Sequence, residues 1–238
     1  MHMCFMGNPG TGKTTLARIV AKAINQEEIY GVGGTFTELD RSGLVHKFQG
    51  FTESLVKNNL RASLGSVFFI DEFYALSGDR EFGNDVGLKA LDVINKYMED
   101  NSNRFCLIAA GYTDEMDNAL AANPGLRDRF TNYIYFEDYT EDELYQVLVK
   151  MLSNKDLELD DEASELLQGY LELIVRNKDK NFGNARLMRD LAEAIRRKQF
   201  ILGKKTNIVD AQTIETIFNT EDKFIKLTEH TTRVKVGF

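Results

Sequence analysis

The chain has 238 residues, a formal net charge of −8, 43% hydrophobic residues and 28% charged residues. This composition is typical of a soluble globular protein, and the length is sufficient for one large and one small domain. The acidic balance argues against a nucleic-acid partner, which usually meets a basic face. No apolar run approaches the roughly 18 residues of a membrane span and no signal peptide precedes the first apolar segment, so we expect a cytoplasmic protein without a membrane partner.

The chain begins with an apolar strand predicted at residues 3–6. Gly-Asn-Pro-Gly-Thr-Gly-Lys-Thr follows at 7–14, and then an amphipathic helix at 14–25. G-x-x-x-x-G-K-T is the P-loop pattern, and strand, loop and helix are the context that it requires. Its glycines let successive N–H groups turn toward a phosphate, above the positive end of the helix dipole. Lys13 is predicted to reach the β- and γ-phosphates, and Thr14 to ligate Mg²⁺. The predicted nucleotide-binding residues of the loop are Asn8, Pro9, Gly10, Thr11, Gly12, Lys13, Thr14 and Thr15.

Apolar runs alternate with helical periods as far as about residue 136, which is typical of an α/β domain with a parallel sheet. The predicted strands are 3–6, 34–39, 66–70, 104–110 and 132–136. The predicted helices between them are 14–25, 52–63, 85–99 and 113–121. The third and fourth strands are almost continuously apolar, as expected for strands covered on both faces. Cys4 and Cys106 lie in such runs and are predicted to be buried thiols in a reducing compartment, not a disulfide or a metal site.

After Glu137 only helical periods follow, at 140–153, 160–176, 184–201 and 210–219. Thr140 and Glu143 form a capping-box pattern at the first of these helices. We therefore predict a nucleotide-binding α/β domain over residues 1–138 and a small all-helical domain over 139–238. A nucleotide site of this kind usually has chain before its first strand, which lines the base pocket. One expectation is therefore an excised module of a longer protein, complete for the phosphates and incomplete for the base.

A second candidate site element is Phe68-Phe69-Ile70-Asp71-Glu72, an apolar strand that ends in two carboxylates. Ligands of open α/β sheets bind at this end of the strands. Asp71 is predicted to hold the Mg²⁺ bound to Thr14, directly or through water, and Glu72 to polarise the water that attacks the γ-phosphate. A solvated strand end is the alternative, because Asp-Glu pairs are common; the P-loop upstream favours the functional interpretation.

The P-loop, the Phe-Ile-Asp-Glu strand end, Ala110-Gly111-Tyr112 and Asn123-Pro124-Gly125-Leu126-Arg127-Asp128-Arg129 follow one another in this order. The arrangement resembles the AAA+ ATPases, and more closely their CbbX/CfxQ and SpoVK group, from residue 2 to about 201. The resemblance implies a P-loop parallel sheet (the AAA+ core) followed by a helical lid domain. It also implies ATP and Mg²⁺ as cofactors, a homo-oligomeric, hexameric ring, and a protein client.

The resemblance assigns the segment 123–130 to the arginine finger, whose guanidinium reaches the γ-phosphate bound by the neighbouring subunit. Arg127 and Arg129 are both candidates, and the sequence does not choose between them. The alternative is that one or both pair with Asp128 or Asp114.

Phe182-Gly183-Asn184-Ala185-Arg186 resembles the sensor-2 motif, in which Arg186 would contact the γ-phosphate from the lid; Arg189 is the second candidate. The alternative is an arginine on the surface of a helix. Sensor 1 departs from the wider superfamily, because Tyr112 stands where many members have Asn. Tyr112 or Thr113 could donate a hydrogen bond there, or Tyr112 simply packs.

The segment 40–50 resembles the first pore loop of protein-threading members, in which an aromatic residue projects into the channel of the ring. Phe48 matches the aromatic and Gly50 the glycine two places on. An exposed aromatic side chain can hold polypeptide of almost any sequence. The alternative is a core phenylalanine at a helix end.

The leading functional hypothesis is a Mg²⁺-dependent ATPase that forms a ring and remodels or threads a protein. A nucleotide-gated scaffold that binds a partner without threading it is the alternative from another class. A small-molecule kinase is a third, which the helical region after residue 138 and the glutamate directly after Asp71 disfavour. No residue identifies the client.

Overall fold

The computed structural model describes residues 1–31, 34–45, 51–77, 86–204 and 206–228. Contacts divide the chain into two units. The first comprises Met1–Asn8 and Gly12–Glu137, and the second comprises Pro9–Thr11 and the chain from Asp138 onward. Residues of the P-loop therefore belong to both units, which the sequence patterns do not predict.

The first unit contains a five-stranded parallel sheet with the strand order β2-β3-β4-β1-β5. Its strands are β1 (Met3–Gly7), β2 (Thr37–Leu39), β3 (Val67–Ile70), β4 (Cys106–Gly111) and β5 (Asn132–Phe136). The predicted α/β class is confirmed, and the predicted strands agree with these within a few residues. Because β4 lies between β1 and β3, the carboxyl ends of these three strands meet at one edge of the sheet.

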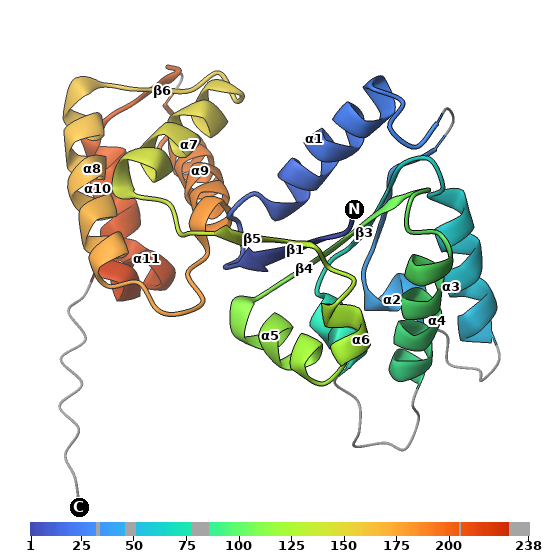
Figure 1. Cartoon of the computed structure of the whole chain (residues 1–238). Coiled ribbons are helices and arrows are strands. Elements are labelled where there is room, and N and C mark those ends of the chain that lie inside the picture. Colours follow the sequence, from blue (N-terminus) through green and yellow to red (C-terminus); the bar gives the residue numbers. More distant parts are fainter. Residues whose placement is uncertain (32–33, 46–50, 78–85, 205, 229–238) are drawn as a thin grey trace, which may run out of the picture. The chain divides into compact units, whose positions relative to one another are not determined.

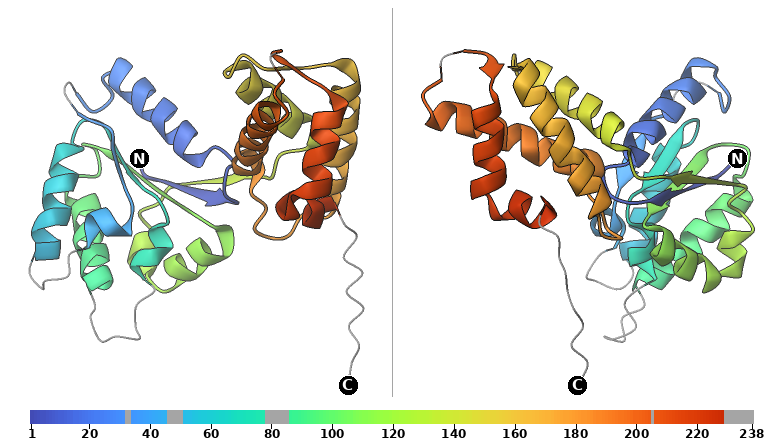
Figure 2. Two further views of the ribbon diagram at one scale, coloured as in Figure 1. Left: turned by 180° about the vertical axis from the view of Figure 1, so that it is seen from behind. Right: turned by 90° about the vertical axis from the view of Figure 1, so that its left-hand side faces the viewer.

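Helices cover both faces of this sheet (Figures 1 and 2): α1 lies on one face, and α3, α4 and α5 lie on the other. The helices of the first unit are α1 (Lys13–Gln26), α2 (Arg41–Leu44), α3 (Phe51–Ala62), α4 (Val86–Asp100), α5 (Thr113–Ala121) and α6 (Pro124–Arg127), with a 3₁₀ turn η1 (Phe73–Leu76). The four longer helices were expected from apolar periodicity. The elements α2, η1 and α6 have four residues each, too few to show a helical period.

Apolar clusters on both faces explain why the central strands have no polar alternation. In β3, Phe69 packs in the cluster under α1, whereas Phe68 packs in the cluster under α3 and α4. Cys4 and Cys106 likewise belong to opposite clusters. Both are free and buried, and this burial raises the pKa of each thiol to about 12. The prediction of buried thiols is confirmed.

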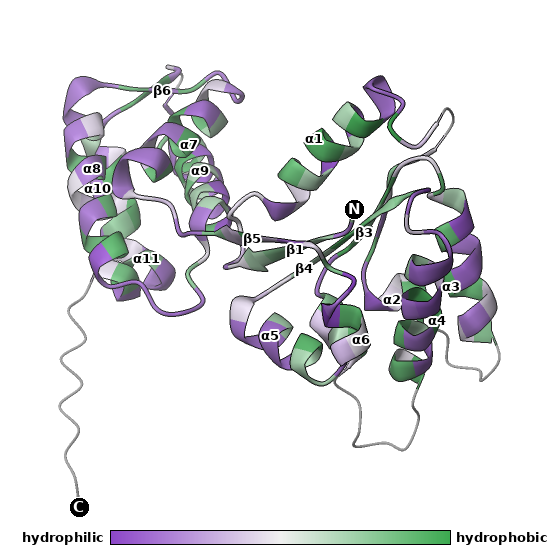
Figure 3. Ribbon diagram, in the orientation of Figure 1, coloured by the Kyte–Doolittle hydropathy of each residue, from purple (hydrophilic) through white to green (hydrophobic). Residues whose placement is uncertain are grey.

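The second unit is helical around its own apolar core. Its helices are α7 (Glu141–Ser153), α8 (Asp161–Arg176), α9 (Asn184–Ile201), α10 (Ala211–Thr220) and α11 (Asp222–Thr228), joined by a two-stranded parallel ladder of β6 (Glu158–Leu159) and β7 (Ile208–Val209). The capping box between Thr140 and Glu143 is present. Green apolar bands alternate with purple polar ones along these helices, as their periodicity predicts (Figure 3). The helix α11 and the ladder were not predicted, and among the described residues no helix is long and apolar enough to cross a membrane.

Candidate functional site

The P-loop residues of the first unit, Gly7, Asn8 and Gly12–Thr14, include two glycines with a positive φ. Gly7 ends β1 with φ of 151°, and a Cβ added there would lie 2.3 Å from the carbonyl oxygen of Phe136. Gly12 has φ of 96° and precedes α1 as its N-cap. Lys13 Nζ donates to the carbonyl oxygens of Gly7 at 2.7 Å and Asn8 at 2.8 Å. A side chain at either glycine would clash or strain the loop, so the residues present fit a phosphate cradle.

Thr14 and Thr15 occupy the first turn of α1, where the backbone N–H groups have no partner within the helix. Thr14 is half-buried and Thr15 is exposed. N–H groups that make no hydrogen bond within the helix, together with the positive end of the helix dipole, favour an anion at this position. The first turn of α1 therefore offers the chemistry that the motif predicts.

The remaining P-loop residues, Pro9–Thr11, lie against the start of α9 in the second unit. The N–H of Ala185 donates to the carbonyl oxygen of Gly10 at 3.2 Å. Gly10 has φ of 74°, and a Cβ there would lie 2.4 Å from the carbonyl oxygen of Gly183. Glycine is thus required at position 10 for both the backbone conformation and this close approach.

The two predicted carboxylates directly follow β3, at the same sheet edge as Gly7. Asp71 is half-buried and Glu72 is exposed. Glu72 has φ of 49° and ψ of 42°, the left-handed conformation, and its N–H donates to Asp71 Oδ1 at 3.0 Å. A residue with a Cβ seldom adopts this conformation, and such strain is concentrated at functional sites.

Tyr112 follows β4 at the same edge and precedes α5. Its ring lies beside that of Tyr74, with centroids 5.8 Å apart. Burial, followed by the negative charge of Glu72, raises the pKa of Tyr74 to about 12. The contributions of Glu72 and Asp71 to this shift show that the phenol lies near the two carboxylates; like an ordinary tyrosine, it is protonated at neutral pH. The sequence analysis missed Tyr74, although its position two residues after Glu72 is a signal.

The two finger candidates differ in their contacts. Arg127, the last residue of α6, is exposed. Arg129 is half-buried; its guanidinium donates to Glu99 Oε2 of α4 at 2.5 Å and to the carbonyl oxygen of Gly125 at 2.5 Å. Among the described residues, the partner of Arg129 is thus Glu99 and not the Asp128 or Asp114 considered above.

Three predicted residues remain: Arg186, Arg189 and Phe48. Arg186 and Arg189 are exposed on the first turns of α9, in the second unit. Phe48 lies outside the described residues, so the pore-loop assignment stays a prediction. The start of that segment is described: Asp40 Oδ1 accepts a hydrogen bond from the N–H of Gly43 and caps α2.

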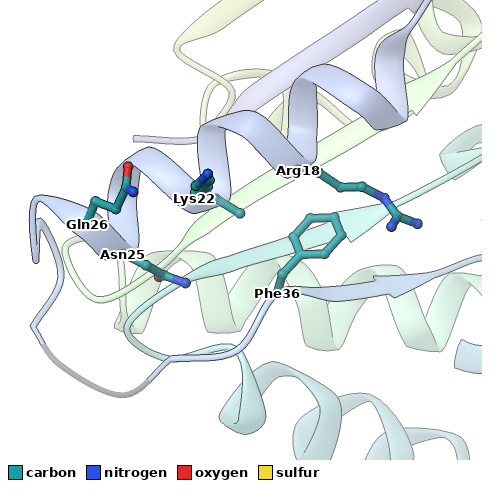
Figure 4. Close-up of a pocket in the computed structure, with 6 residues that line it drawn as sticks. Arg18, Lys22, Asn25, Gln26 and Phe36 are labelled. Carbon is teal, nitrogen blue, oxygen red and sulfur yellow. The ribbon is translucent and has the colours of Figure 1, made fainter.

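An open hollow of about 490 Å³ lies between the C-terminal half of α1 and Phe36 (Figure 4). Its lining residues are Arg18, Ala21, Lys22, Asn25, Gln26 and Phe36. The Arg18 guanidinium lies 5.9 Å from the centre of the Phe36 ring and is paired with Glu38 at 2.6 Å. The lining contains no residue of the predicted nucleotide site, so we assign the hollow no role in it.

Comparisons with known proteins agree with this arrangement. Residues 3–138 match the model of the "ATPase family associated with various cellular activities (AAA)", and residues 140–224 match the AAA lid domain. Stage V sporulation protein K of Bacillus subtilis is 36% identical over 221 residues, which cover 90% of this chain and 67% of that protein. CbbX of Cereibacter sphaeroides is 34% identical, covering 91% of this chain and 70% of CbbX. The chloroplastic ribulose bisphosphate carboxylase/oxygenase activase of Cyanidioschyzon merolae is 34% identical, covering 90% and 74%.

Solved structures share the fold at lower identity. The Thermotoga maritima RuvB Holliday junction branch migration motor has a TM-score of 0.63 and 23% identity, covering 92% of this chain and 61% of that one. The FIGL-1 AAA domain in complex with ADP has a TM-score of 0.64 and 20% identity, covering 97% and 72%. The chain therefore spans about two thirds of the length of its curated relatives and 61% of the RuvB chain. The chain belongs to the AAA family of ATPases, P-loop enzymes that hydrolyse ATP, and carries an AAA core followed by an AAA lid domain.

Proposed function

We propose that this chain is the motor module of a Mg²⁺-dependent AAA ATPase that assembles into a hexameric ring and remodels a protein partner. The observation that carries the proposal is the convergence of three strand ends at one sheet edge: β1 leads into the P-loop, β3 into Asp71 and Glu72, and β4 into Tyr112. In this proposal phosphate binding follows β1, whereas metal binding and water activation both follow β3 of the same sheet.

Mg²⁺ would be held by the Thr14 hydroxyl and the Asp71 carboxylate together with the nucleotide phosphates. Among the described residues, no group of three or more His, Cys, Asp or Glu side chains could hold a metal by itself. That accords with Mg²⁺, which is usually bound through one or two carboxylates plus substrate phosphates. When bound, the ion neutralises charge on the phosphates; Lys13 adds a second positive charge, and Glu72 accepts the proton of the attacking water.

The shared site between subunits rests on Arg127 and Arg129. One of these two arginines would contact the γ-phosphate of the ATP bound by the adjacent subunit. Arg186 would contact the γ-phosphate of the ATP bound by its own subunit. A closed ring supplies every site with such a neighbour. The relatives named as CbbX and as a carboxylase/oxygenase activase support a protein as the client. The free cysteines Cys4 and Cys106 support the cytoplasmic location that we propose.

The threading part of the proposal is tested at Phe48. If this side chain holds the client, Phe48→Ala should abolish the stimulation of ATPase activity by an unfolded polypeptide while the basal rate changes less than about twofold. The physical reason is the loss of an aromatic contact that is indifferent to client sequence. The measurement is steady-state ATP hydrolysis with and without reduced, carboxymethylated lactalbumin, and Phe48→Tyr, which keeps the ring, is the matched control.

The same experiment separates the motor from the scaffold. A scaffold would bind the polypeptide in a nucleotide-dependent way, and Phe48→Ala would leave that binding and its effect on turnover unchanged. Equal stimulation of the wild type and Phe48→Ala would therefore rule out threading through Phe48 and favour the scaffold.

A further inference from the structure

Three successive P-loop residues, Pro9–Thr11, belong to the second unit. Their carbonyl oxygens accept hydrogen bonds from donors of the same unit. Asn184 Nδ2 donates to the carbonyl oxygen of Pro9 at 3.4 Å. The N–H of Ala185 donates to the carbonyl oxygen of Gly10 at 3.2 Å. The hydroxyl of Tyr139 donates to the carbonyl oxygen of Thr11 at 3.2 Å. Each peptide group from Pro9 to Gly12 is thus held through its oxygen.

Hydrogen bonds to these carbonyl oxygens also fix the direction of the N–H groups in the same peptide units. In a trans peptide the C=O of one residue and the N–H of the next point in opposite directions, and the described chain has no cis peptide bond. The N–H groups of Gly10, Thr11 and Gly12 are therefore turned away from the donors of the second unit. These are the amides with which a P-loop cradles a phosphate.

Asn184 connects this arrangement through hydrogen bonds of its side-chain amide to several of its members. It is fully buried, with φ of 45°, a conformation that Asn tolerates better than most residues. Its Oδ1 accepts from the N–H of Tyr139 at 2.8 Å, and its Nδ2 donates to Asp138 Oδ1 at 2.8 Å and to the carbonyl oxygen of Phe182 at 3.0 Å. Two amide protons serve three acceptors, so the 3.4 Å contact to Pro9 is the weakest of them. The 2.8 Å bond to Asn184 Oδ1 also holds the backbone of Tyr139, the residue whose hydroxyl binds Thr11.

We propose that Tyr139 and Asn184 are positioning residues for phosphate binding: they hold the carbonyl side of Pro9–Thr11 so that its amide side is already formed when a phosphate arrives. Pre-formed donors do not have to be reoriented when the ligand binds, which lowers the cost of binding. This inference rests on the proposed nucleotide function and adds to it the residues that shape the phosphate cradle.

The decisive variant is Tyr139→Phe, which removes only the hydroxyl. One hydrogen bond of this kind corresponds to about a three- to tenfold change in affinity. We expect the dissociation constants for MgADP and for inorganic tripolyphosphate, measured by calorimetry, to rise by about that factor. Tripolyphosphate has no base or sugar, so it reports on phosphate binding alone. If Tyr139 acts only on phosphate binding, the loss of affinity should be equal for the two ligands. Asn184→Gly, which accepts the left-handed backbone without strain, is expected to raise both constants by about tenfold or more.

Tyr170→Phe is the matched control, because its ring stacks on Phe218 in the same unit at 3.9 Å between centroids. A purely structural role for Tyr139 would lower the unfolding temperature of the Tyr139→Phe variant and leave both dissociation constants at the wild-type value. Equal phosphate affinity in Tyr139→Phe, Tyr170→Phe and the wild type would overturn the inference, even if Asn184→Gly did not fold.

Lys13→Ala distinguishes the two possible failures. If the wild type binds tripolyphosphate and Lys13→Ala does not, the phosphate site is established and Tyr139→Phe tests the inference alone. If the wild type binds neither MgADP nor tripolyphosphate, the proposed function fails, and the inference fails with it.

Discussion

Glu72→Gln is expected to bind ATP with nearly wild-type affinity and to lose at least about 100-fold in turnover, because an amide cannot accept the proton of the attacking water. Gln has the same shape as Glu, so the left-handed backbone at position 72, with φ of 49°, is retained at the same cost. Two measurements are needed: nucleotide affinity by calorimetry, and the steady-state rate of phosphate release.

Glu28→Gln provides a matched control for this substitution. Glu28 is also exposed and also has φ of 49°, but it lies just beyond the C-terminal end of α1. Its variant should hydrolyse ATP at the wild-type rate. Normal turnover in Glu72→Gln would reject the assignment of Glu72 as the base, whereas equal losses in both variants would point to a general effect of the charge.

The finger variant, Arg127→Ala or Arg129→Ala, is expected to lose about 1000-fold or more in turnover and to recover when mixed with Lys13→Ala. An arginine finger contributes at this level in related phosphoryl-transfer enzymes. Neither variant alone has an intact site, but an interface that combines Lys13 from one subunit with the arginine of the next does. Random mixing at equal amounts makes about a quarter of the interfaces intact.

The Arg129–Glu99 ion pair provides the control for this experiment. Glu99→Ala breaks the same pair, whose Nη2–Oε2 distance is 2.5 Å, without removing the guanidinium. If Arg129 is the finger, Glu99→Ala should retain most of the turnover that Arg129→Ala loses. If the ion pair alone matters, the two variants should behave alike, and mixing with Lys13→Ala should rescue neither.

The assembly of each variant is measured in parallel, by light scattering in the presence of nucleotide. Rescue by only one arginine variant identifies the finger. Absence of rescue in both, although mixed rings of full size form, would contradict a site shared between subunits.

Local patterns were sufficient for the sheet and for the candidate site at its edge. The strand at 66–70 is apolar throughout because helices cover both its faces, and such a run is visible without any tertiary information. The P-loop and Asp71-Glu72 are likewise contiguous motifs. The sequence placed Asp71 and Glu72 at the carboxyl end of their strand, where ligands of open α/β sheets bind. Only the structure gives the strand order that puts β4 between β1 and β3 and so brings the three strand ends together.

The short elements could not be predicted for a physical reason. A four-residue helix such as α6 shows no apolar period, and its stability comes from what it packs against. Leu126 is the buried residue of α6, and it packs in the cluster that includes Phe130 and Met116. Pairing of Arg129 was expected as an alternative, but with a neighbouring aspartate; the partner is Glu99, 30 residues away in sequence.

The sequence by itself determined the P-loop motif, the position of two carboxylates after the third strand, the α/β class and the helical region after residue 137, because each depends on residues adjacent along the chain. Only the tertiary structure decided how the loop is held. Tyr139 and Asn184 contact it from 128 and 175 residues away, through hydrogen bonds to backbone oxygens. Every residue has the same backbone carbonyl oxygen. The side chains of the loop therefore do not indicate which residues bind its carbonyl oxygens.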